Sequence, residues 1–312
     1  MTAANVSEDG QRGGLELTFC WAGLTAGTHG QLRFISILNS FLAITASLGN
    51  ALILVALRKE SSLHPPSKLL LSNLAATDLC VGIISHPLFV IFLISVMNER
   101  WDICRYVSLT GFIADPIFCG VSLSTLTAIS VDRLLALSLG LRYRQVVTLR
   151  RTYVIVITFW VLQTVISMMM LRNVLIAISC SILVASLCLA TSIFSYTKIF
   201  FTLRRHQNQV QDHTQQLNQT NQLNIARYRN VVCTALWLQF MLAICYLPDS
   251  IVVALMSIGG LSTPLFLARE YTITLVYLNS SLNPILYCWK INEVKQAVKD
   301  TIRKVLLCPS IN

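Results

Sequence analysis

Seven long apolar runs dominate this sequence and constrain its fold more than any other feature. They cover residues 32–57, 69–97, 106–139, 152–171, 174–203, 231–258 and 264–289. A transmembrane α-helix needs about 20 predominantly apolar residues, and each run is long enough for a tilted helix. With 54% hydrophobic and only 12% charged residues, the chain is too apolar for a soluble domain. We therefore predict an all-α, seven-transmembrane helix bundle.

The distribution of basic residues predicts the orientation of this bundle. If the N-terminus lies outside, 18 of the 24 Lys and Arg residues lie on the inner side, as the positive-inside rule requires. We expect an extracellular N-terminal tail over residues 1–31, the bundle over 32–290, and an amphipathic eighth helix with a cytoplasmic tail over 291–312. Because the charges fall in short clusters between apolar runs, the net charge of +10 is attributed to the topology of a multi-pass membrane protein, and no nucleic-acid partner is expected.

Three polar segments outside the runs carry further expectations. The sequon Asn5-Val6-Ser7 would face the glycosylating compartment, which makes Asn5 a candidate glycosylation site. Residues 291–307 place apolar and basic side chains at helical spacing and are expected to lie on the inner leaflet. Cys308 follows, where an acyl chain could anchor the end, with an unmodified cysteine as the alternative. The polar segment 204–224 is expected to be a cytoplasmic loop or an extension of the adjoining helices.

Polar side chains inside the apolar runs are costly in a bilayer and are therefore candidate functional residues. Asp78 lies in the middle of the second run, where a carboxylate must be protonated, hydrogen-bonded or neutralised by a cation. Hydroxyl and amide oxygens from other runs could complete a site for a small hard cation such as sodium. The candidate sodium ligands are Asp78, Ser122, Asn279, Ser280 and Asn283. The alternative is a protonated Asp78 in a purely structural network.

Short motifs follow one another in a fixed order along the runs. They are Gly49-Asn50, Asn73-Leu74-Ala75-Ala76-Thr77-Asp78, Asp132-Arg133-Leu134, Trp160, Cys245-Tyr246-Leu247-Pro248 and Asn283-Pro284-Ile285-Leu286-Tyr287. In these residues the chain resembles a rhodopsin-like (class A) G-protein-coupled receptor, from about residue 32 to 308. The resemblance implies a receptor that binds an extracellular ligand and activates heterotrimeric G proteins, with arrestin as a further partner. Leu134 and Tyr246 depart from the Tyr and Trp that the family usually has there.

The resemblance also assigns residues for coupling and switching near the inner side. Arg133 is expected to pair with Asp132 at rest and to meet the C-terminal helix of the G protein in the active state. A basic residue snorkelling to the inner interface is the alternative for Arg133. The full set of coupling and switch residues is Asp132, Arg133, Tyr196, Pro248, Pro284 and Tyr287.

At the outer end the resemblance implies a ligand pocket. Asp115 falls where amine receptors of this family carry the aspartate that pairs with a ligand ammonium, and Tyr277 falls where they place its tyrosine partner. Asp249 adds a second acid with no obvious basic partner nearby, which favours a cationic amine or a small peptide as ligand. The candidate ligand-binding residues are Asp115, Cys119, Cys180, Ser181, Tyr246, Asp249 and Tyr277. A structural pair of Asp115 with Tyr277 or Arg105 is the alternative.

The outer disulfide of the family is expected in a shifted position. Ser108 stands where the family has its helix-three cysteine, and Cys104 lies one turn further out. Cys20 is the only other cysteine expected on the outer side, so the candidate bridge joins Cys20 to Cys104.

An ion or proton transporter or channel is the alternative function. Asp78, Asp115 and Asp249 could form a relay of intramembrane carboxylates. The ordered motifs and the lack of an internal repeat favour the receptor. No enzyme is predicted, because the sequence shows no cluster of His, Cys and acidic residues with catalytic or metal-ligand spacing.

Overall fold

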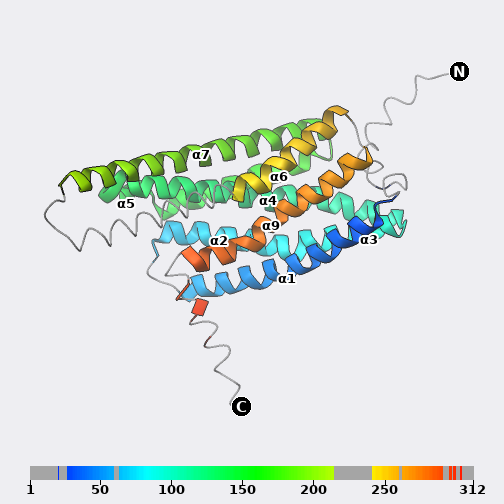
Figure 1. Cartoon of the computed structure of the whole chain (residues 1–312), viewed down its shortest axis with the longest axis horizontal. Helices are drawn as coiled ribbons and strands as arrows, with labels where there is room; N and C mark the ends of the chain where they lie inside the picture. Colours follow the sequence, from blue (N-terminus) through cyan, green and yellow to red (C-terminus); the bar gives the residue numbers. More distant parts are fainter. Residues whose placement is uncertain are drawn as a thin grey trace, which may run out of the picture.

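The computed structural model describes residues 20, 27–59, 63–213, 241–259 and 262–290, together with 295, 296, 298, 299 and 303. Within these ranges every regular element is helical, and the long helices lie alongside one another as a bundle (Figure 1). Six helical segments are long and apolar enough to cross a membrane. The seventh expected span is α9 (Thr263–Lys290), which packs beside α1 (His29–Lys59) in the same bundle and is less apolar because it contains Arg269 and Glu270. The predicted helix bundle is confirmed.

The remaining elements follow the expected runs closely. They are α2 (Pro65–Cys80), the π-helical turn η2 (Val81–Ser85), α3 (His86–Met97), α4 (Trp101–Leu139), the 3-10 turn η3 (Gly140–Arg142), α5 (Tyr143–Val146), α6 (Leu149–Met169), α7 (Val174–His213) and an unlabelled helix over Met241–Gly259. One continuous span, Pro65–Met97, therefore comprises α2, η2 and α3. Because α7 continues to His213, residues 204–213 extend a helix rather than form a loop.

The pattern of exposure on α1 is the one expected of a helix that faces lipid. Its exposed face carries large apolar side chains at intervals of three and four residues, namely Phe34, Ile37, Phe41, Ile44 and Leu48. Its buried face carries polar residues, including Ser36, Asn39 and Asn50. A soluble helix has the opposite arrangement, so the bundle encloses its polar groups and presents apolar side chains outward.

Helix α4 is the central element of the bundle. It packs against α2, α3, α6 and α7, and it ends at Gly140, whose φ of +50° is a conformation that side chains rarely adopt. Across the bundle, a Cβ on Gly49 would lie 2.9 Å from Pro284 Cγ, so the small residue permits close contact between α1 and α9. These contacts hold the polar residues of α2, α4 and α9 at fixed positions inside the bundle.

Some predictions fall outside the described residues. Asn5 and Cys308 lie there, as does most of the expected amphipathic segment 291–312. Of that segment, residues 295, 296, 298, 299 and 303 are described and helical, and Val298 is buried. The backbone of Tyr287 lies in α9, whereas its side chain is outside the described part of the chain.

Candidate functional site

A cavity of about 460 Å³ lies between α3, α4, α6, α7, the helix of Met241–Gly259 and α9. It is lined by six of the seven candidate ligand-binding residues, namely Asp115, Cys119, Ser181, Tyr246, Asp249 and Tyr277. The placement of Cys180 is corrected, because this residue lies in a separate groove with Leu175 and Leu183. One residue turns an α-helix by about 100°, so Ser181 lines the cavity while Cys180 is directed away from it.

Asp115 is held in the cavity by Tyr277. The Tyr277 hydroxyl donates a 2.6 Å hydrogen bond to Asp115 Oδ2, while the buried Oδ1 has no hydrogen-bond partner. The buried hydroxyl of Ser85 lies near the carboxylate but is outside hydrogen-bond geometry. Arg105, the other partner considered, is exposed. Asp115 therefore has one oxygen fixed by Tyr277 and one buried oxygen without a hydrogen-bond partner.

The tyrosine that positions Asp115 is itself fixed by aromatic packing. Tyr277 is fully buried, and its ring centroid lies 4.9 Å from that of His86 and 5.6 Å from that of Phe89. Asn39 Oδ1 lies 3.0 Å from His86 Nδ1, and Asn39 Nδ2 donates a hydrogen bond to the hydroxyl of Thr274 on α9. Residues of α1, α3 and α9 thus form one connected support for the carboxylate.

Asp249 has a basic partner, which corrects the expectation that none lies nearby. Arg269 Nη1 donates to Asp249 Oδ1 at 2.8 Å, and the Thr272 hydroxyl donates to the same oxygen at 3.1 Å. This is the one ion pair found between described side chains. Because the guanidinium compensates its charge, Asp249 is not a free anion in the cavity.

Asp78 is the centre of a buried hydrogen-bond network deeper in the bundle. Ser122 and Ser280 each donate to Asp78 Oδ1 at 2.9 Å, and Asn283 Nδ2 donates to Oδ2 at 2.7 Å. Asn279 makes no hydrogen bond to Asp78, and its buried Nδ2 lacks a partner among the described residues. Four of the five candidate sodium ligands therefore come into direct contact.

The oxygens around Asp78 suit a small hard cation. A carboxylate and two hydroxyl groups supply oxygen ligands, and each hydroxyl that now donates could turn its proton away and offer a lone pair. Asn283 would remain as a donor to the second carboxylate oxygen. The same residues can thus form either the observed hydrogen-bond network or a site for a sodium ion.

The arrangement near the C-terminal end of α4 differs from the expected Asp132–Arg133 pair. Asp132 accepts hydrogen bonds from Ser67 at 2.8 Å and from Tyr143 at 2.7 Å, and it forms no ion pair with Arg133. Arg133 is exposed, whereas Asp132 is buried. No sequence pattern points to Tyr143, because nothing distinguishes a tyrosine between two apolar runs that will fold back onto the bundle.

The other switch residues occupy ordinary packing positions. Tyr196 is buried on α7 in a small apolar cluster with Ile199 and Leu134. Pro284 lies inside α9, and Pro248 lies in the helix of Met241–Gly259. Their role in switching stays a prediction.

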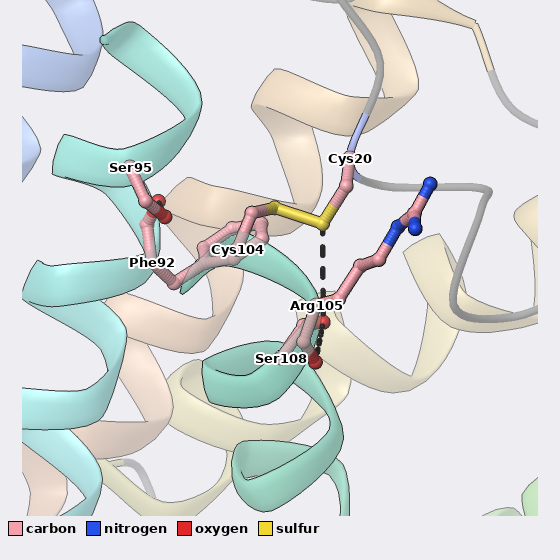
Figure 2. The surroundings of a disulfide bond; sticks show 6 residues. All are labelled: Cys20, Phe92, Ser95, Cys104, Arg105 and Ser108. Carbon is pink, nitrogen blue, oxygen red and sulfur yellow. Dashed lines mark hydrogen bonds between the residues drawn. A yellow bond between two sulfur atoms is a disulfide. The ribbon is translucent and has the colours of Figure 1, made fainter. Parts of the chain in front are cut away.

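A disulfide joins Cys20 to Cys104 near the N-terminal end of α4 (Figure 2). The two Cα atoms are 6.0 Å apart, and Cys20 Sγ lies 4.0 Å from the hydroxyl of Ser108. Ser108 also lines the cavity, so the bridge lies at its outer margin.

Two polar cavity residues, Gln163 and Glu270, are not among the candidate residues predicted from the sequence. Gln163 is buried on α6 and Glu270 is buried on α9. Glu270 and Arg269 could have been found by the rule that identified Asp78, since both are ionisable residues within an apolar run. Gln163 carries the same signal, since it is a polar residue within the apolar run 152–171, and its side-chain amide packs against Gly120.

Replacement of Gly120 by alanine is expected to destabilise the bundle and reshape this wall. A Cβ on Gly120 would overlap the side-chain amide of Gln163. Overpacking costs about 1–3 kcal/mol, and because the overlapping atoms are the end of a flexible side chain, we expect a cost near the lower value. Thermal unfolding of the purified protein measures the effect. Gln163→Ala removes the overlapping atoms. The double variant should therefore lose less free energy of unfolding than the sum of the losses in the two single variants. Simple additivity would contradict this account.

Comparison with known proteins relates the whole bundle to one family. The family described as 7 transmembrane receptor (rhodopsin family) matches residues 49–175 and 171–287. The alpha-2B adrenergic receptor of Rattus norvegicus is 35% identical over 41% of this chain and 28% of its own length. The muscarinic acetylcholine receptor M3 of Rattus norvegicus is 33% identical over 43% of this chain and 22% of its own. The chain thus spans less than a third of these two relatives. The adenosine receptor A3 of Ovis aries is 24% identical over 86% of this chain and 89% of its own length.

Proposed function

This chain belongs to the rhodopsin family of seven-transmembrane receptors, and on that premise we propose that it is a G-protein-coupled receptor for an extracellular ligand with a cationic group. The observation that supports the ligand class is the state of Asp115, which lines the cavity with one oxygen held by Tyr277 and the other unpartnered. The names of the three relatives specify different ligands. The proposed class of ligand therefore rests on the chemistry of the cavity and not on the names of the relatives.

A protonated amine complements this cavity in two ways. Its ammonium would donate a charge-assisted hydrogen bond to the open oxygen of Asp115, which is stronger than a neutral one and is enhanced in a low dielectric. Aromatic side chains in the wall, including Phe89, Phe112 and Tyr246, would pack against its apolar part and against the cation. Because Asp249 is compensated by Arg269, Asp115 is the principal anchor.

The proposed orientation has the N-terminus outside the plasma membrane. Disulfides persist in oxidising compartments, and the bridge between Cys20 and Cys104 lies at the same end of the bundle as the cavity mouth. The excess of Lys and Arg at the opposite end agrees with the positive-inside rule. Glycosylation of Asn5 and acylation of Cys308 belong to the same proposal.

We further propose a sodium ion at Asp78, with Ser122, Ser280, Asn279 and Asn283 around it. The ion would neutralise a carboxylate that is fully buried and has no basic side chain bonded to it. Asp78, Ser122 and Ser280 would hold the ion through oxygen atoms, and Asn283 would orient the carboxylate. Helix α4 contributes Asp115, Ser122 and Arg133 at successive depths, so the ligand site, the ion site and the inner surface share one helix.

The proposed inner partners are a heterotrimeric G protein and arrestin. Arg133 is exposed at the inner end of α4 and is available for contact. Its neighbour Asp132 is bonded to Ser67 on α2 and to Tyr143 on α5, so the second inner loop is tied to the bundle. Loss of the hydrogen bonds from Ser67 and Tyr143 to Asp132 is the local change that G-protein binding would require.

Replacement of Tyr143 by phenylalanine is expected to raise ligand-independent signalling. The change removes the hydrogen bond to Asp132 while keeping the ring packed near His64. A net loss of about 1 kcal/mol shifts a two-state equilibrium roughly fivefold. Basal G-protein activation at matched surface expression measures the effect. Tyr153→Phe, at an exposed position on α6, is the control, and equal basal activity in both variants would contradict the proposal.

A matched ligand screen tests the proposed ligand class. Cells that express the chain are exposed to protonated amines, to short basic peptides and to uncharged isosteres of each, with calcium and cyclic-nucleotide readouts. We expect responses to amines and none to the uncharged isosteres. Responses that are equally strong to charged and uncharged compounds would overturn the assignment.

A further inference from the structure

The cavity is lined by a third carboxyl group, that of Glu270, which has no role in the proposed binding of an amine to Asp115. Glu270 lines the cavity and is only 3% exposed, and its Oε2 has no hydrogen-bond partner among the described residues. A buried polar atom without a partner costs free energy. Its position in the wall means that a bound molecule could supply the missing donor.

The neighbouring guanidinium does not satisfy Glu270. Arg269 directs Nη1 to Asp249, and the described residues contain no ion pair between Arg269 and Glu270. The cavity lining thus has three carboxyl groups, on Asp115, Asp249 and Glu270, against the single cation of Arg269. Two of these carboxyl groups, on Asp115 and Glu270, each keep an oxygen without a partner.

The two open carboxyl groups lie at different depths of the same cavity. Glu270 precedes Tyr277 by seven residues on α9, which is nearly two full turns, so the two residues share a face and are separated by roughly 10 Å along the axis. Tyr277 in turn holds Asp115 at 2.6 Å. Glu270 is therefore displaced from the Asp115 anchor along the length of the cavity.

Apolar side chains form part of the cavity wall near these two acids. Ile273 and Val276 lie on α9 between Glu270 and Tyr277, and Phe89 and Phe92 line the cavity from α3. A molecule that reaches from one acid to the other would place an apolar segment against these side chains. Burial of that segment is favourable in proportion to its area.

We propose that this cavity is selective for a dication, namely a molecule with two protonated amines separated by an apolar spacer. One ammonium bonds to Asp115 and the other to Glu270. This inference rests on the proposed function, since it keeps Asp115 as the first anchor, and it adds Glu270 as the residue that distinguishes dications from monocations. Each ammonium donates a hydrogen bond to one carboxyl oxygen that otherwise has no partner, so the second ammonium contributes a second charge-assisted hydrogen bond to binding.

Calorimetric titration of the purified chain in nanodiscs tests the proposal, with empty nanodiscs to subtract partitioning into lipid. The probes are α,ω-diaminooctane, whose extended span approaches the roughly 10 Å between the two levels, the shorter α,ω-diaminopropane, and octylamine. We expect diaminooctane to bind about 10- to 100-fold more tightly than octylamine, which is the range for one charge-assisted hydrogen bond. Diaminopropane, which cannot reach both acids, should show no such advantage.

Variants separate this inference from the proposed function. Glu270→Gln should reduce the affinity for diaminooctane to that for octylamine and leave octylamine binding unchanged, whereas Glu99→Gln, at an exposed turn, should change neither. If octylamine binds through Asp115 but diaminooctane gains nothing, or if Glu270→Gln has no effect, the dication inference is wrong and the cationic-ligand function stands. If neither amine binds the wild-type chain, both are wrong.

Discussion

Replacement of Asp115 by asparagine is expected to lower the affinity for a cationic agonist about 10- to 100-fold. Asparagine has the same shape and can still accept the hydrogen bond from Tyr277, which the structure places at 2.6 Å. It lacks the charge, however, and a hydrogen bond to a charged group contributes about 1.5–3 kcal/mol. A concentration–response curve for an amine identified by the screen measures the shift, with surface expression determined in parallel.

Tyr277→Phe provides the matched control for this loss. It leaves the carboxylate charged but removes the hydrogen bond that orients it, so the expected loss is smaller than for Asp115→Asn. The ring packing with His86 and Phe89 is retained, which keeps the support intact. An unchanged curve for Asp115→Asn at normal expression would show that Asp115 is only a structural partner of Tyr277.

Replacement of Asp78 by leucine is expected to destabilise the receptor by at least about 3 kcal/mol. The leucine has a similar size but accepts no hydrogen bond, so the donors of Ser122, Ser280 and Asn283 would lose their partner at once. Each buried donor left unsatisfied costs about 1–3 kcal/mol. Thermal unfolding of the purified protein is the direct measurement, and an unfolding temperature equal to that of the wild type would contradict the network described.

Asp78→Asn separates this stability effect from sodium binding. Its amide oxygen can accept from Ser122 and Ser280, and the amide of Asn283 can turn to accept the new N–H, so stability should stay close to wild type. The charge that would attract sodium is lost. Agonist affinity measured in sodium chloride and in N-methylglucamine chloride should differ for the wild type and be equal for Asp78→Asn. Equal affinity of the wild type in both salts would remove the sodium proposal.

The sequence alone was sufficient for the helices because a bilayer imposes one simple requirement on each of them. An apolar run of sufficient length has to become a helix when no water is present to satisfy its backbone. The π-helical turn η2 could not be anticipated in this way. It lies where Gly82 meets α1, and a Cβ there would be 2.8 Å from the backbone nitrogen of Ser47. Such a turn depends on a contact between two helices. The hydropathy of a single run contains no information about that contact.

Site residues could be predicted where the rule for ionisable residues within apolar runs applies to a single position. Contacts between residues of two different helices could not be predicted. Asp78 and Asp115 stood out as acids within apolar runs, and both are centres of hydrogen bonding. The pairing of Arg269 with Asp249, twenty residues earlier, could not be anticipated, because it depends on how α9 packs against the helix of Met241–Gly259. Likewise, Asp132 was assigned to its sequence neighbour, whereas the folded chain offers it the hydroxyl groups of Ser67 and Tyr143.

The most direct test of the receptor assignment is nucleotide exchange on a purified G protein. The chain is reconstituted in nanodiscs with a panel of heterotrimeric G proteins, and binding of a non-hydrolysable GTP analogue is followed after addition of the amine that binds best. We predict a ligand-dependent rise in exchange with at least one G protein, which is lost in both Asp115→Asn and Arg133→Ala although the latter still binds the amine. Binding of the amine without exchange on any G protein, or exchange that persists in both variants, would contradict the account.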